Sequence, residues 1–313
     1  MHFVASYPKS GNTWIRLVTA AYALEGVSAA DFMNFDEDDE SKVSNVMRFG
    51  DRTKYYYQAV SPFPIGPLDF STEVRLRPAA MMILEREMAE TTTKRPILAK
   101  SHHLNGDVDG IDLWNPAWTD RVVNPVRDPR EVCCSFAAHL GRGYEHTAKF
   151  MNKPKATLGD RSPDGEPHHL LGTWSQHIKG WLSEDEVPVH TVRYEDMKAN
   201  PVGEFYDIFD FLDAPDLTVE RVEEAVRKTS FDRLQKVEAE HEFPESMDHQ
   251  DSFFRSGKTD GWKGELPVRL VRKIEKDAVL LNVKFQGEAT GRTRTGSSAR
   301  RSKYEAVSAS QRR

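Results

Sequence analysis

The chain opens with HFVASYPKSGNTWIRLVTAAYAL, residues 2–24. Residues 2–7 have the composition of a short buried strand, and the apolar residues from 13 to 24 recur at helical spacing. The loop between them, residues 8–12, contains Gly11, which permits close approach of the backbone to a ligand. The N-terminus of the following helix offers unpaired N–H groups to an anion. A strand, a tight loop and a helix in this order predict a phosphate-binding arrangement.

This loop differs from the nucleoside-triphosphate loop, G-x-x-x-x-G-K-[ST], in the position of its lysine. Ser6 replaces the first glycine of that pattern, Gly11 keeps the second, and Asn12 stands where the lysine is expected. The lysine lies instead at Lys9. This displacement favours a cation beside the leaving oxygen of a shorter 5' group over a cradle for β- and γ-phosphates. The alternative for the loop alone is an ordinary strand-to-helix turn with a solvated lysine.

The remaining pattern predicts a single P-loop-like α/β domain over residues 1–285, with a central parallel β-sheet flanked by helices. The 313 residues are 38% hydrophobic and 29% charged, which is enough for one large core. Strand and helix patterns alternate with no linker-like stretch before residue 285. Further buried strands are expected at 96–100, 121–126 and 189–192.

Residues 286–313 form a basic tail. They carry seven Lys or Arg residues and two Glu residues, so that the tail is near +5 and the rest of the chain near -11. Few large apolar groups are present, and such a segment cannot bury enough surface to offset its ordering entropy. We expect a disordered, solvated tail, which is favoured over an arm that binds anions or nucleic acid.

The two cysteines, Cys133 and Cys134, are adjacent on one predicted helix. They point to different faces and are expected to be reduced core residues. The first strand begins near His2, which leaves no room for a signal peptide in this sequence. No run approaches the ~18 apolar residues of a membrane span. We therefore expect a cytoplasmic protein with no membrane partner.

The opening loop resembles that of the cytosolic-type sulfotransferases, which use 3'-phosphoadenosine 5'-phosphosulfate as co-substrate. The family loop reads Y-P-K-S-G-T-T-W, and residues 7–14 match it except at Asn12. The resemblance implies that this loop binds the 5'-phosphosulfate. The implied donor-binding residues of the loop are Lys9, Ser10, Gly11, Asn12, Thr13 and Trp14.

Four more segments resemble the same family, in the family's order. Arg127, at the end of a predicted strand, and Ser135, two turns along the next helix, resemble the pair that grips the 3'-phosphate. Asp128-Pro129 between them reads as a helix cap with a first-turn proline. The other segments are the adenine-side residues Tyr194, Thr229 and Phe231, and the 3'-phosphate segment Arg255, Ser256 and Gly257. Ser256 departs from the family, which has lysine there.

A candidate base follows the predicted strand at 96–100, within Lys100-Ser101-His102-His103. A histidine has a pKa near neutrality and can accept the proton of an acceptor hydroxyl. The residues alone leave His102 and His103 open, because only one of two successive side chains is expected to face the site. The resemblance assigns the catalytic histidine to His102. It implies an in-line displacement at sulfur, in which Lys9 and Lys100 stabilise the charge on the departing oxygen.

No metal is expected, since we find no compact group of His, Cys and carboxylate residues with ligand spacing. The acceptor, a small-molecule, glycosylated or phenolic hydroxyl or an amine, is expected over the strand ends, between loops at 30–70, 103–118 and 140–170. Aromatic residues that either line its site or pack in the core are Phe49, Tyr55, Tyr56, Tyr57, Phe63 and Trp114. The oligomeric state stays open. Two alternatives are a kinase-type phosphotransferase and a nonenzymatic nucleotide-binding module.

Overall fold

The computed structural model describes residues 1–33, 35, 41–91, 95–159, 162, 165–247, 249–250 and 252–278. The predicted tail at 286–313 and the predicted domain end at residue 285 lie outside these residues. Within the described part, no helix combines the length and the apolar character that crossing a bilayer requires.

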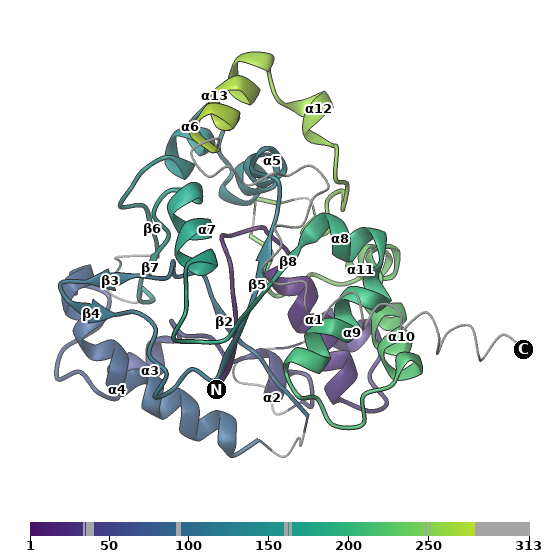
Figure 1. The fold of residues 1–313 in the computed structure, drawn as a ribbon, viewed down its shortest axis with the longest axis horizontal. Coiled ribbons are helices and arrows are strands. Elements are labelled where there is room, and N and C mark those ends of the chain that lie inside the picture. Colours follow the sequence, from purple (N-terminus) through teal and green to yellow (C-terminus); the bar gives the residue numbers. More distant parts are fainter. Residues whose placement is uncertain are drawn as a thin grey trace, which may run out of the picture. The chain divides into compact units, whose positions relative to one another are not determined.

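A four-stranded parallel sheet lies at the centre (Figure 1), in the order β2, β1, β5, β8. Its strands are β1 (His2–Ala5), β2 (Ala99–Ser101), β5 (Arg121–Val126) and β8 (Val189–Arg193). In register, Phe3 of β1 pairs with Ala99 of β2 and with Val122 of β5. The predicted fold class, a parallel sheet flanked by helices, is therefore confirmed.

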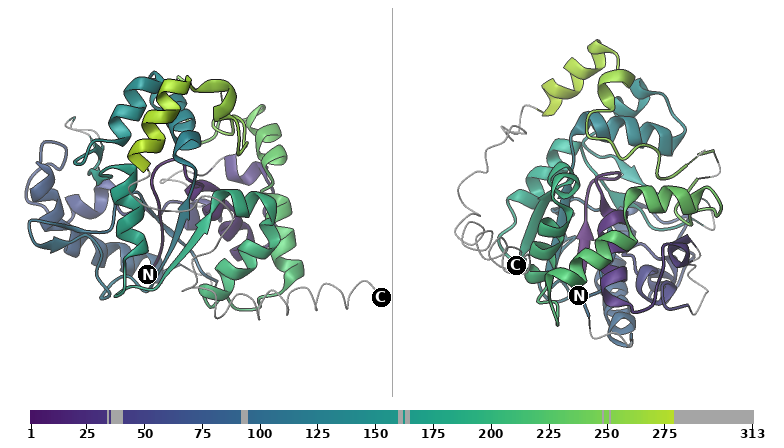
Figure 2. Two further views of the ribbon diagram at one scale, coloured as in Figure 1. Left: turned by 45° about the horizontal axis from the view of Figure 1, so that its top comes forward. Right: turned by 90° about the vertical axis from the view of Figure 1, so that its right-hand side faces the viewer.

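Helices cover both faces of the sheet, in two groups that Figures 1 and 2 show on opposite sides of the strands. One group consists of α1 (Asn12–Ala23), α9 (Pro201–Phe211) and α10 (Val219–Lys228), which contact one another. The other consists of α5 (Pro129–Leu140), α6 (Tyr144–Met151), α7 (Trp174–Leu182) and α13 (Val268–Ala278). The remaining helices are η1 (Ala30–Met33), α2 (Ser44–Met47), α3 (Lys54–Gln58), α4 (Phe70–Ala89), α8 (Tyr194–Ala199), α11 (Phe231–Glu238) and α12 (Trp262–Glu265).

Two short hairpins extend the loops beyond the sheet. They pair β3 (Asp107–Val108) with β4 (Ile111–Asp112), and β6 (Thr157–Leu158) with β7 (His169–Leu170). Together with η1, α2, α3 and α6, they lie in stretches where the sequence shows only weak secondary-structure signals. These elements are short, so periodicity gives them little signal.

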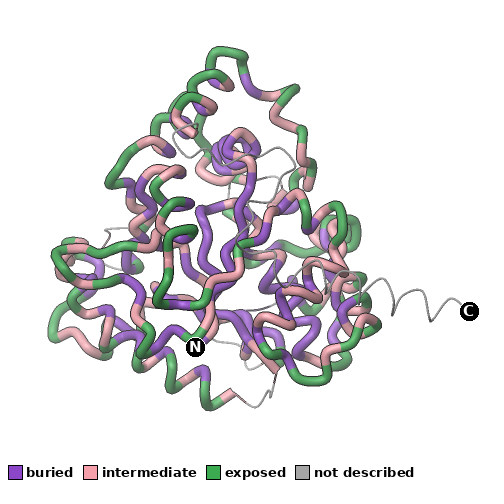
Figure 3. Tube along the Cα trace, viewed as in Figure 1, coloured by how far each residue is buried: buried purple, intermediate pink, exposed green. Residues whose placement is uncertain are grey.

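The core is built from the strands and from the inner faces of the helices (Figure 3). Phe3, Val4, Val122 and Val123 are fully buried in the sheet, as parallel strands covered on both faces require. The two cysteines are buried and free, which confirms the predicted reduced pair. Burial raises the pKa of each thiol to about 12.

Local signals place α5 where the sequence predicts it. The carboxylate of Asp128 accepts a hydrogen bond from the backbone N–H of Arg130, and Pro129 occupies the first helical position. The strand predicted over 121–126 has the same bounds in the structure, whereas those predicted over 2–7 and 96–100 are shorter or shifted. Residues 6 and 7 leave the sheet because they begin the loop to α1.

Candidate functional site

The opening loop leaves β1 at the edge where all four parallel strands end. Two of its residues have left-handed backbone conformations, Lys9 with φ 66° and Gly11 with φ 112°. A Cβ atom at Gly11 would lie 3.0 Å from Cδ2 of Tyr194 and 3.2 Å from Cε of Met197. The loop therefore needs glycine for two reasons, its backbone conformation and the close contact with α8.

Asn12 connects the loop to the neighbouring strands β1 and β2. Its Nδ2 donates hydrogen bonds to Val4 O at 3.0 Å, Ser6 Oγ at 3.3 Å and Ser101 O at 3.3 Å. The side chain is buried, so these bonds form away from water. Its amide nitrogen thus stabilises the end of the sheet, and this explains the departure from the lysine of a triphosphate loop.

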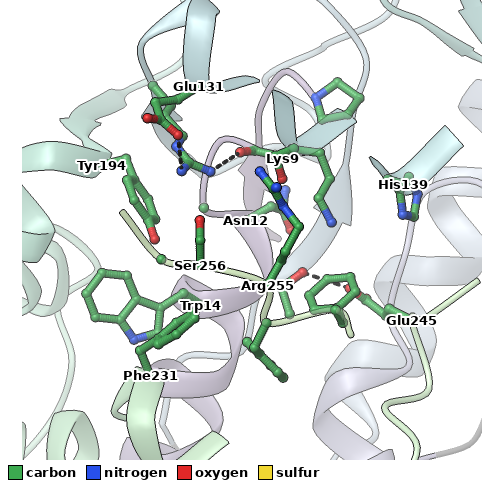
Figure 4. Close-up of a pocket in the computed structure, with 18 of the residues that line it drawn as sticks. Lys9, Asn12, Trp14, Glu131, His139, Tyr194, Phe231, Glu245, Arg255 and Ser256 are labelled. Atoms are coloured by element: carbon green, nitrogen blue, oxygen red, sulfur yellow. Dashed lines mark hydrogen bonds and ion pairs between the residues drawn. The ribbon is translucent and has the colours of Figure 1, made fainter. Parts of the chain in front are cut away.

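A cavity of about 160 Å³ opens above this edge of the sheet (Figure 4). Every predicted site residue except Ser10 lines it, including the loop, Arg127, Tyr194 and the Arg255 segment. Ser10 is fully buried, and its hydroxyl has no hydrogen-bond partner among the described residues. Segments that are far apart in the sequence therefore line one cavity.

Arg127 joins the loop to two other segments of the site. Its guanidinium donates to Lys9 O at 3.2 Å, to the Glu131 carboxylate at 3.2 Å and to Lys258 O at 3.0 Å. It also lies 4.3 Å from the centre of the Tyr194 ring. Ser135 follows on the same helix and lines the cavity.

The segment around Arg255 lies opposite the loop. Nη1 of Arg255 pairs with the carboxylate of Glu265 at 2.9 Å, and the hydroxyl of Tyr144 donates to that carboxylate at 2.9 Å. Gly257 has φ 56°, and a Cβ atom there would lie 2.7 Å from the Phe231 ring. Arg255 and Arg127 line the same cavity, which provides two guanidinium groups for an anion.

Aromatic side chains form another part of the wall. The rings of Trp14 and Tyr194 meet edge to face with centroids 6.1 Å apart, and Nζ of Lys198 lies 5.2 Å from the centre of the Phe231 ring. The hydroxyl of Thr229 donates to Ala225 O at 2.9 Å and so completes the end of α10. These flat groups suit a purine ring.

The two candidate histidines have different surroundings. Nδ1 of His102 lies 2.8 Å from Ser6 O, and its side chain lines the cavity. A carbonyl only accepts, so Nδ1 carries the proton and Nε2 is left with a lone pair. Nδ1 of His103 instead accepts from the backbone N–H of Leu170 at 3.0 Å, outside the residues that line the cavity. Of the two histidines, His102 lines the cavity and His103 does not.

Burial, together with a neighbouring positive charge, keeps His102 neutral. Burial, and then the positive charge of Lys100, hold its pKa well below 6.5. Burial lowers the pKa of Lys9 to about 8, with Glu245 opposing that shift and Lys100 and Arg127 adding to it. Burial likewise lowers the pKa of Lys100, although Glu245 opposes it. The site thus combines a neutral imidazole with cations whose pKa values are depressed.

Several cavity residues were not predicted from the sequence. Glu245, His139 and Phe253 line the cavity, but they lie in stretches without a recognisable motif. Glu131, which accepts from Arg127 and from the backbone N–H of Trp262 at 3.0 Å, is different. It lies four residues after Arg127, and the i, i+4 pair was a signal that could have identified it.

The aromatic residues proposed for the acceptor site do not line this cavity. Phe49, Tyr56, Tyr57 and Trp114 are buried in the core, and the side chains of Tyr55 and Phe63 are exposed. The alternative expectation, that these aromatic residues pack in the core, is therefore correct for the four that are buried. Sequence alone could not separate the two readings because both require apolar surface.

Asp51, His103 and His169 form a compact group that sequence spacing did not reveal, with candidate ligand atoms within 4.8 Å of one another. Asp51 already pairs with Nη2 of buried Arg77 at 2.8 Å, and accepts from Ser101 Oγ at 2.7 Å and from His169 Nε2 at 2.7 Å. The guanidinium balances the carboxylate charge. The carboxylate is therefore held by a hydrogen-bonded network, while Nδ1 of His169 is buried without a hydrogen-bond partner among the described residues.

The fold and the site together define an α/β protein with a P-loop-like strand-loop-helix unit whose loop lysine is displaced. Residues 2–280 match the family model described as the sulfotransferase domain, and the chain belongs to this family. It is 37% identical over 155 residues to sulfotransferase 1A1 of Rattus norvegicus, covering 47% of this chain and 50% of the relative. It is 26% identical over 185 residues to luciferin sulfotransferase of Photinus pyralis, covering 56% of this chain and 47% of the relative. The chain thus spans about half the length of the curated relatives it matches.

A solved structure with the same fold is retinol dehydratase in complex with androsterone and the inactive cofactor PAP. It superposes with a TM-score of 0.57 at 18% identity, covering 92% of this chain and 82% of that one.

Proposed function

We propose that this protein transfers a sulfuryl group from 3'-phosphoadenosine 5'-phosphosulfate to an acceptor hydroxyl or amine. One observation carries the proposal. A neutral histidine, His102, lines the same cavity as the loop lysine Lys9 and as two arginines, Arg127 and Arg255. A base, a cation for the leaving oxygen and a second anion site are the parts that such a transfer requires.

The donor is proposed to lie along the cavity. The loop residues Lys9 to Trp14 bind the 5'-phosphosulfate, with Ser10 contributing through the buried turn. Arg127, Ser135 and the Arg255–Gly257 segment bind the 3'-phosphate, and Ser256 supplies a hydroxyl instead of a charge. Tyr194, Thr229 and Phe231 surround adenine together with Trp14. Support comes from the family and from the PAP-bound state of the related structure.

The chemical step is an in-line displacement. Nε2 of His102 accepts the proton as the acceptor oxygen or nitrogen forms its bond to sulfur. The bond between sulfur and the bridging oxygen breaks, and its electron pair stays on the 3',5'-bisphosphate. Lys9 and Lys100 stabilise that charge, so most of the rate acceleration comes from positioning and electrostatics. No covalent enzyme intermediate and no metal is part of this proposal.

The acceptor is proposed to be a small molecule, with a phenolic or glycosylated compound as the first class to examine. Leu158 and Phe253 give the cavity apolar lining beside its charged groups. An acceptor with an apolar body and a single reactive hydroxyl suits this combination.

The test incubates the purified chain with radiolabelled phosphosulfate donor and a panel of phenols, alcohols, amines and sugars. Label should move to at least one acceptor class. Transfer of phosphate from labelled ATP would overturn the proposal in favour of the phosphotransferase. Binding of adenosine 3',5'-bisphosphate without transfer to any acceptor would favour the nonenzymatic module.

A further inference from the structure

Glu245 lies in the connection between α11 and α12, which forms one wall of the cavity through Glu245 and residues 253–257. The rings of Phe243, Phe253 and Phe254 pack against one another in this connection. The carboxylate of Glu238, at the end of α11, accepts from the backbone N–H of Phe254 at 3.0 Å and from Ser252 Oγ at 2.7 Å. These ring contacts and hydrogen bonds hold in place the connection that carries Glu245.

The carboxylate of Glu245 is engaged by three donors. Oε1 accepts from Arg16 Nη1 at 2.5 Å and from Lys100 Nζ at 2.9 Å, and Oε2 accepts from Thr13 Oγ1 at 2.7 Å. Burial acts to raise the pKa of Glu245, but Lys100 and Arg16 hold it well below its usual range. Glu245 is thus an anion and a poor base. Figure 4 shows it beside the cavity that Lys9 and Arg255 also face.

Two of these three donors, Thr13 and Lys100, are groups that the proposed function assigns to the phosphosulfate end of the donor. The single hydroxyl hydrogen of Thr13 cannot serve two anions at once, and the Lys100 ammonium that pairs with Glu245 has fewer N–H groups and less net charge for a second anion. A phosphosulfate placed against them would also meet the charge of Glu245 at close range, in a partly buried site where screening is weak. Glu245 and the 5' end of the donor therefore compete for the same partners.

We propose that Glu245 is a positioning residue that occupies the 5' anion site of the empty enzyme. Its carboxylate keeps Lys100 and Thr13 oriented and their charge balanced, and it leaves them when the 5'-phosphosulfate binds. Donor binding thus exchanges one anion for another on preformed partners. This inference rests on the proposed function, because it takes the 5' anion site from it.

The test compares two nucleotides that differ only at the 5' position. Calorimetry measures the binding of adenosine 3',5'-bisphosphate and of adenosine 3'-monophosphate to the wild type, Glu245→Gln and Glu242→Gln. The Glu245→Gln substitution keeps an acceptor for Arg16 but removes the competing charge. We expect this variant to bind the bisphosphate about tenfold more tightly than the wild type does. The affinity for the 3'-monophosphate should stay within about twofold.

Glu242 is exposed in the same connection and is the matched control, so Glu242→Gln should change neither affinity. An unchanged or weakened bisphosphate affinity in Glu245→Gln would overturn the inference, and so would an equal gain for both nucleotides. If Glu245→Gln does not unfold cooperatively, Glu245→Asp replaces it. This variant keeps the charge for Arg16 on a shorter side chain, and it should tighten bisphosphate binding alone. If the wild type binds neither nucleotide, the proposed function is contradicted as well as the inference. If the wild type binds the bisphosphate and only the gain in Glu245→Gln is missing, the inference alone is contradicted.

Discussion

Nδ1 of His102 lies 2.8 Å from the backbone oxygen of Ser6, which couples the candidate base to the first residue of the opening loop. The loop and the base are contributed by neighbouring strands, because β1 pairs with β2. The hydrogen bond selects the tautomer with a lone pair on Nε2. One contact therefore sets the tautomer of the histidine and its position relative to the loop.

His102→Ala should lower kcat by about 10² to 10⁴, the range of a general base, while the affinity for adenosine 3',5'-bisphosphate stays near the wild-type value. Steady-state kinetics and calorimetry measure the two quantities. The control is His146→Ala, because His146 is exposed on α6 and should have no effect on either. Near-normal kcat in His102→Ala would move the base to another residue.

The pH dependence of kcat/KM should reflect Lys9. Its pKa is lowered to about 8. The proposed mechanism requires the ammonium form, which stabilises the leaving oxygen. Activity should therefore fall as the pH rises through about 8. The acid limb should lie well below pH 6.5, because the lowered pKa of His102 keeps the base neutral there.

Lys9→Arg tests this assignment. An arginine stays protonated throughout the accessible range, so the variant should lose the alkaline limb even if its maximal rate is lower. A limb that stays near pH 8 in Lys9→Arg would mean that another group causes it.

Arg255→Ala should separate the two phosphates of the donor. Loss of one charge-assisted contact, worth about 1.5–3 kcal/mol, should weaken adenosine 3',5'-bisphosphate by about tenfold or more. Binding of adenosine 5'-phosphosulfate, which has no 3'-phosphate, should change little. Competition binding with the two nucleotides gives the comparison. An equal loss for both would place Arg255 elsewhere on the donor.

Asn12→Thr, which restores the residue of the family loop, should destabilise this protein. The substitution removes the buried hydrogen bonds that the amide donates to Val4 O, Ser6 Oγ and Ser101 O, and their loss should cost about 1–3 kcal/mol in total. Urea unfolding should show a loss in that range, and Asn12→Asp should lose more because its carboxylate would face the same carbonyls. Wild-type stability in Asn12→Thr would show that the three hydrogen bonds contribute nothing net.

Most of the residues that line the cavity could be predicted as candidates because they lie in local motifs at strand ends. Arg127 follows a strand predicted with its observed bounds, and Asp128 and Pro129 begin α5 through short-range geometry. Parallel strands place their carboxyl ends at one edge, so separate motifs converge once the sheet order is known. The position of Glu245 at the cavity could not be predicted. Glu245 lies 145 residues from its partner Lys100, in a connection without periodicity.

The sequence by itself determined the loop, its displaced lysine, the parallel α/β class and the family, because each depends on short local motifs and on their order along the chain. Only the tertiary structure decided that His102 faces the cavity while His103 joins Asp51 and His169. It also showed that Asn12 supports the sheet and that Glu245 binds Lys100. These outcomes depend on contacts between distant segments, and burial and charge pairing across such contacts leave no pattern along the chain.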